Sequence, residues 1–186
     1  MVRQTLSIVI SLFALVGCAT FGTKTLYKSG STIHPTKIGF TKLDGNSIVN
    51  KIHPSTDSAF SSTVIEIFKK YGVTDVIPSK TELPFENPDA KVIAQICAEN
   101  NLQGLVVSRL MFINISYSLA IIPLGKTWDT EVKMKVFNSD GTLLLTVSHN
   151  TANGNSYGYV PPPQQTIRDG TKGAINRIAK EFSLGK

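Results

Sequence analysis

The most reactive side chains of this chain belong to two cysteines and three histidines. Cys18 follows an apolar run near the start of the chain, whereas Cys97 stands on the apolar side of a predicted helix. A catalytic or metal-bound thiolate needs a base or further ligands close by. We therefore expect Cys97 to be a buried, inert thiol without a disulfide partner. Covalent chemistry is expected at Cys18.

The residues before Cys18 are typical of a secretory signal: Arg3 is basic, residues 6–14 are mostly apolar, and small residues follow. The run Leu15-Val16-Gly17-Cys18 resembles the lipobox of bacterial lipoproteins, in which the cysteine sulfur takes a diacylglyceryl group. This resemblance implies that residues 1–17 are a signal peptide, that the mature chain starts at Cys18, and that acyl chains hold it to a membrane. An ordinary cleaved signal and an uncleaved helical anchor are the alternatives.

The residue after the cysteine, Ala19, is not Asp. By resemblance to enterobacterial sorting signals, this implies the outer membrane as the destination. Residues 18–35 are rich in Thr, Lys, Ser and Gly, which predicts a flexible tether spanning roughly 20 to 25 Å. Residues 36–186 then form a single α/β domain.

The histidines do not indicate a metal site. His34, His53 and His149 are far apart, and none has a metal-ligand spacing with Cys, Asp or Glu. His149 alternates with apolar residues near a strand end, so we expect it to be half-buried and hydrogen-bonded. The chain also lacks a Gly-rich phosphate loop, a nucleophile elbow and a His-Glu-x-x-His pair. We expect no metal, no cofactor and no enzymatic activity.

The charge of the chain does not favour nucleic acid as a partner. Lys and Arg number 19 against 13 Asp and Glu, and removal of the signal with Arg3 leaves 18 against 13, or +5. The basic residues are scattered and do not form a stripe with interleaved aromatics, so the pattern of a nucleic-acid interface is missing.

Hydrophobic periodicity predicts strands and helices that alternate before a strand meander. Residues 37–43 form a strand closed by the turn Asp44-Gly45, and a helix runs from Ser55 or Asp57 to Tyr71, ended by Gly72. A second strand, a loop and a second helix follow at 73–77, 78–88 and 89–102, with Asn87 as the cap, Pro88 in the first turn and Gly104 at the end.

The second half predicts a meander and one more helix. Residues 105–119 are apolar and long, but polar residues interrupt them and 113–119 alternate with period two, which favours a strand over a membrane helix. Strands at 130–136 and 143–148 flank the turn 138–141, and a helix covers 164–182. The predicted fold is an α+β sandwich with a mixed sheet of about five strands and three main helices.

Two connections carry apolar or aromatic residues that the predicted core does not use. Residues 120–128 link two strands and include Trp128, and residues 157–163 present Tyr157 and Tyr159 on a proline-rich segment. Exposed aromatics provide large contact areas for partners. We expect Trp128, Tyr157 and Tyr159 to contact a partner, unless these side chains fold back onto the core or lead rigidly into the last helix.

The order of elements resembles a group of cell-envelope domains. A first strand of the Lys-Ile-Gly-Phe type, a strand like Gly104-Leu105-Val106-Val107-Ser108 and a turn like Ser139-Asp140-Gly141 are similar to features of curli-secretion-channel lipoproteins, lipoprotein activators of penicillin-binding proteins and the amino-terminal domain of the Tol-system propeller protein. The resemblance implies an α/β domain over about 36–182 that assembles channels or touches partner proteins. The chain departs from the channel type because it lacks a second pair of long amphipathic hairpins.

We therefore expect a lipid-anchored binding or assembly module that recruits an envelope protein partner, with a homo-oligomer left open. The alternatives are an anchored cell-wall hydrolase or other enzyme, and a subunit of an oligomeric envelope channel.

Overall fold

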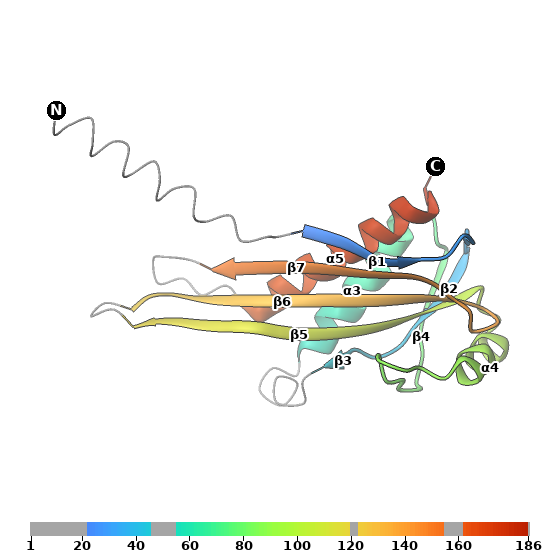
Figure 1. Cartoon of the computed structure of the whole chain (residues 1–186), viewed down its shortest axis with the longest axis horizontal. Helices are drawn as coiled ribbons and strands as arrows, with labels where there is room; N and C mark the ends of the chain where they lie inside the picture. The colour runs from blue at the N-terminus through green and yellow to red at the C-terminus, as the bar shows by residue number, and fades with distance from the viewer. Residues whose placement is uncertain (1–21, 46–54, 120–122, 155–161, 186) are drawn as a thin grey trace.

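The computed structural model describes residues 22–45, 55–119, 123–154 and 162–185, with 113–119, 123–128 and 153–154 described by their backbone alone. Within these residues the chain forms one seven-stranded sheet and three helices (Figure 1). Their order is β1 (Gly22–Lys28), β2 (Lys37–Phe40), β3 (Asp44–Gly45), α3 (Ser55–Lys70), β4 (Asp75–Pro78), α4 (Ala90–Asn100), β5 (Gly104–Leu119), β6 (Pro123–Asn138), β7 (Leu143–Gly154) and α5 (Pro163–Phe182). The predicted α+β class is confirmed, with seven strands in place of about five.

The sheet is mixed, and its two halves are built differently. The strand order is β1-β7-β6-β5-β2-β4, and β3 also pairs with β5. Strand β2 runs parallel to both β4 and β5, whereas β5, β6, β7 and β1 pair antiparallel. Parallel neighbours need a crossover connection, and α3 and α4 lie within the two crossovers. The antiparallel half is the predicted meander with β1 added at its edge.

Strands β5 and β6 form a long hairpin of 16 residues a side, paired from Gly104 with Asn138 to Leu119 with Pro123. The prediction of a connection over 120–128 is therefore wrong for residues 123–128, which belong to β6. The physical reason is that the alternating residues of β5 offer a pairing edge along their whole length. Pro123 is tolerated as the first residue of a strand, because its missing N–H removes a single ladder bond.

The prediction of a flexible tether over 18–35 is wrong for residues 22–28, which form strand β1. Gly22–Lys28 pairs antiparallel with β7, with Gly22 opposite Asn150 and Lys28 opposite Leu145. The sequence of this segment lacks the alternation of apolar and polar residues by which strands are recognised. Its seven residues are exposed or half-buried, and none is buried. Backbone pairing and polar side chains hold it in place.

Helices cover the two faces of the sheet unequally. Helices α3 and α5 lie together on one face, over a core that includes Phe60, Phe68, Val132, Met134 and Ile175. Helix α4 covers one end of the other face, where Ile93 and Cys97 pack against Leu105, Val107 and Phe137. Arg109, Lys133 and Lys135 lie at every second position from Val107 and Phe137 along β5 and β6, so they give this second face polar side chains beyond α4. None of the described helices is long and apolar enough to cross a membrane.

Most helix signals and the turn at 138–141 are confirmed, but the turn predicted at Asp44-Gly45 is wrong, because these residues form β3 and pair with β5. Gly72, with φ of +86°, follows α3 as predicted. The prediction of Asn87 as the cap of α4 is wrong, because Asp89 is the cap: its Oδ1 accepts from the N–H of Lys91 at 2.8 Å. The helix then ends at Asn101, which adopts the left-handed conformation with φ of 52°, three residues before the predicted stop at Gly104.

Candidate functional site

The residues singled out for function are distributed over described and undescribed parts of the chain. Cys18, Tyr157 and Tyr159 lie outside the described residues. Trp128 lies within β6, opposite Ile115 of β5 and Asn153 of β7. It therefore belongs to a strand and not to the predicted connection. Its backbone position is described, and its contact role stays a prediction.

Cys97 lies in the apolar cluster under α4, with 1% of its surface exposed. Burial raises the pKa of its thiol, which keeps the group protonated at neutral pH and poorly nucleophilic. The prediction of a buried cysteine is confirmed.

His149 lies at the junction of β7, β1 and α5. Its Nδ1 is 2.6 Å from Oγ1 of Thr23, and its ring covers Gly173, where an added Cβ would lie 2.3 Å from the ring atoms. Burial lowers the pKa of His149, while the negative charge of Asp169 raises it. The prediction of a half-buried, hydrogen-bonded histidine is confirmed. Among the described residues, no three His, Cys, Asp or Glu side chains are placed to hold a metal ion.

An acidic corner that the sequence did not reveal lies beside β3. A cavity of about 470 Å³ is lined there by Lys42, Leu43, Asp44, Gly45, Asp57, Glu82, Leu83 and Pro84. Burial raises the pKa of Asp57, and Glu82 adds to this while Lys42 opposes it. Lys42 forms an ion pair with Glu82 at 3.1 Å, with both side chains largely exposed, so the pair contributes little stability. Asp44 has a structural task, because its Oδ2 accepts from the N–H of Phe85 at 3.0 Å.

The loop before α4 is fixed to the polar face of the sheet. Nζ of Lys135 in β6 donates to the carbonyl oxygens of Phe85 and Glu86, each at 2.8 Å, and lies 4.6 Å from the centre of the Phe85 ring. Arg109 of β5 forms an ion pair with the Glu86 side chain. These contacts attach the loop to one end of the sheet.

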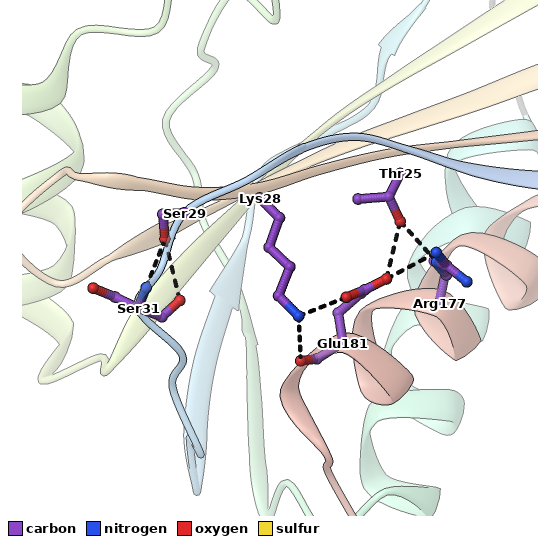
Figure 2. A network of polar contacts seen from close by, with 6 residues as sticks. All are labelled: Thr25, Lys28, Ser29, Ser31, Arg177 and Glu181. Carbon is purple, nitrogen blue, oxygen red and sulfur yellow. Dashed lines mark hydrogen bonds and ion pairs between the residues drawn. The ribbon is translucent and has the colours of Figure 1, made fainter.

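A polar network joins the edge strand β1 to the last turns of α5 (Figure 2). Glu181 is its centre: one carboxylate oxygen accepts from Nζ of Lys28 at 2.7 Å, and the other accepts from Oγ1 of Thr25 at 3.1 Å. Arg177 donates from Nε to Oγ1 of Thr25 at 2.7 Å and pairs with Glu181 at 2.9 Å. These partners lower the pKa of Glu181, the hydrogen bond from Lys28 most of all. The sequence does not predict this network, because Thr25 and Lys28 lie in the segment 18–35 that has the composition of a tether.

Beyond this network, no strand of the described part of the chain pairs with the outer side of β1. Leu26 and Tyr27 are the exposed large hydrophobic residues of the described part of the chain, at 54% and 47%. They stand next to an irregularity in the pairing of β1 with β7 between Thr25 and Tyr27. An edge strand with exposed apolar side chains is a surface on which another chain can pair.

Comparison with known proteins identifies the fold. No protein-family model matches the sequence, and no curated protein matches it. The dodecamer of PelC from Paraburkholderia phytofirmans has a TM-score of 0.56 at 11% identity, covering 84% of this chain and 96% of that chain. A variant PelC dodecamer from the same organism has a TM-score of 0.55 at 10% identity, covering 89% and 99%. Lipoprotein GNA1162 from Neisseria meningitidis is 12% identical over 77% of this chain and 98% of that chain, with a TM-score of 0.46. The described domain therefore has the fold of the PelC subunit along nearly all of that subunit's length.

Proposed function

We propose that this chain is a lipid-anchored protein of the bacterial cell envelope whose α+β domain recruits protein partners, further copies of itself among them. The observation that carries the proposal is the fold shared with PelC, a protein that forms a dodecamer. The lipobox-like run ending at Cys18 supplies the anchor, and Ala19 after it favours the outer membrane.

The exposed surfaces support an assembly role. Within the described residues, β1 lies at the edge of the sheet with no strand on its outer side, and it carries two exposed apolar side chains, Leu26 and Tyr27, close to the anchored end of the chain. Monomeric proteins normally protect exposed strand edges, so the open edge of β1 is suited to pairing with a partner protein. We propose Trp128, Tyr157 and Tyr159 as further contacts, and no catalytic role for the domain.

Self-association is tested on the lipidated protein extracted from membranes in a mild detergent. Native mass spectrometry is expected to detect an oligomer, and Tyr27→Lys together with Leu26→Lys is expected to reduce it to smaller species. Lys80→Glu, a change at an exposed position in the loop after β4, is the matched control and should leave the oligomer intact. A monomer at all accessible concentrations would contradict self-association, and recruitment would then rest on a different protein.

A further inference from the structure

Strand β1 is attached to the domain in a way that no other long strand shares. None of its residues is buried, whereas β5, β6 and β7 each contribute buried apolar residues to the core. Side-chain attachment of β1 therefore depends on hydrogen bonds and ion pairs, through Thr23, Thr25 and Lys28. Elements with few buried apolar contacts open locally at a lower free energy than the core does.

The residue of α5 that binds β1, Glu181, carries a charge that its position in the helix does not favour. Glu181 lies in the last turn of α5, which ends at Phe182, and a negative charge there opposes the helix dipole. Lys28 compensates this charge from β1, and Arg177 compensates it from within the helix. Docked β1 therefore supplies one of the two cations that compensate this carboxylate, together with the hydrogen bond from Thr25.

The rest of the domain is fixed independently of β1. After the strand, Ile33 packs against the main core, and the backbone N–H groups of Thr36 and Lys37 donate to Oε1 of Gln103 at 2.6 and 3.0 Å. Within β1 the pairing with β7 is already irregular between Thr25 and Tyr27. Release of β1 therefore leaves β2 and the core in place.

We propose that β1 is a releasable strap: it undocks from β7 and α5 while the remaining sheet stays folded, and so sets how far the domain stands from its anchor. The inference rests on the proposed lipid anchor at Cys18. With β1 docked, Cys18 is four residues from Gly22, so the anchor lies within about 14 Å of the sheet. With β1 released, the chain from Cys18 to Ile33 reaches roughly 50 Å when extended.

Hydrogen exchange measured by mass spectrometry on the full lipidated protein tests the strap. The amides of β1 are expected to exchange at least about tenfold faster than those of residues 132–137 in β6. Glu181→Gln and Thr25→Val should each accelerate exchange in β1 severalfold and leave β6 unchanged. Thr25→Val is informative because Val favours strands, so acceleration must come from the lost hydrogen bonds. Glu99→Gln, on the exposed side of α4, is the matched control.

A disulfide between β1 and β7 should slow hydrogen exchange in β1. Lys24 and Ser148 are directly opposite each other, so Lys24→Cys with Ser148→Cys allows a disulfide between β1 and β7. Exchange in β1 should slow to the rate of its neighbours when this pair is oxidised and recover on reduction. If β1 exchanges at the rate of β6 in the parent protein, or if Glu181→Gln accelerates exchange across the whole sheet, the strap proposal is wrong.

The rate at which trypsin releases the domain from vesicles tests both the strap and the anchor. Lys24 and Lys28 are the first tryptic sites after Cys18, so cleavage of an undocked β1 frees the domain from the membrane. Release should be several times faster for Glu181→Gln than for the parent protein, and equal rates would contradict the proposal. A protein that never floats with vesicles would instead contradict the anchor, while hydrogen exchange would still decide the strap.

Discussion

At the scale of single residues, His149 links the stability of the domain to pH. Burial lowers its pKa in the folded state below the value near 6.5 of an unfolded chain. The unfolded state therefore binds a proton first as pH falls, so the stability from neutral His149 is complete above about 6.5 and is lost below it. Urea unfolding at pH 7.5 and 5.5 should show a loss of stability that shrinks in His149→Gln. An equal loss in that variant would contradict this role.

Gly141 is a second residue with a testable constraint. It closes the turn between β6 and β7 with φ of +86°, and its N–H donates to the carbonyl oxygen of Asn138 at 3.0 Å. An added Cβ would lie 2.3 Å from the carbonyl oxygen of Ala90 at the start of α4, and backbone cannot move aside as a side chain can. Gly141→Ala should lower the free energy of unfolding by about 2 kcal/mol or more.

The control for this prediction is Gly72→Ala. Gly72 shares the same φ of +86°, but an added Cβ there meets nothing within 4 Å. Its effect measures the backbone strain alone, at about 1 kcal/mol. Chemical denaturation that ranks the two variants equally would show that α4 does not constrain the turn.

At the scale of elements, Lys135 is expected to hold the loop before α4. Lys135→Met removes two charge-assisted hydrogen bonds to the carbonyl oxygens of Phe85 and Glu86 and should destabilise the protein by about 1.5 to 3 kcal/mol. Lys133→Met is the matched control two residues away, because Lys133 makes a partly exposed ion pair with Glu131. Proteolysis of the loop should accelerate only in the first variant.

The elements also show what the sequence could predict. Helices α3 and α5 and the turn at 138–141 were predictable, because their apolar stripes and turn residues are local signals that the structure uses as they stand. Strand β1 was not, because Thr, Lys and Gly without apolar alternation are typical of a tether, and only pairing with β7 makes them a strand. The sequence predicts a connection at Trp128 because residues 123–128 lack the period-two alternation of 130–136, and their pairing with β5 and β7 makes them part of β6.

The candidate site was predictable only in part for the same reason. Buried Cys97 and half-buried His149 follow from local patterns. The network around Glu181 joins residues about 150 positions apart, as in the pair Thr25 and Glu181 with a separation of 156. Local patterns in the sequence do not predict a contact between residues so far apart.

At the scale of the whole molecule, the partner contacts can be separated from the fold. Trp128→Ala and the double variant Tyr157→Ala with Tyr159→Ala should each weaken partner capture from envelope extracts by more than about 1 kcal/mol, because aromatic anchors dominate interface energies. Circular dichroism should show that both variants remain folded. Capture at the parent level by both variants would remove these residues from the working surface, and unfolding would place them in the core.

Mass spectrometry of the mature amino-terminal peptide tests most directly whether an acylated cysteine anchors this domain. We expect a first residue of Cys18 whose mass includes a diacylglyceryl group, and a Cys18→Ser variant that lacks this group and leaves the membrane fraction or stays unprocessed. A mature chain that begins at another residue, or an unmodified Cys18 on a protein that still fractionates with membranes, would contradict this expectation.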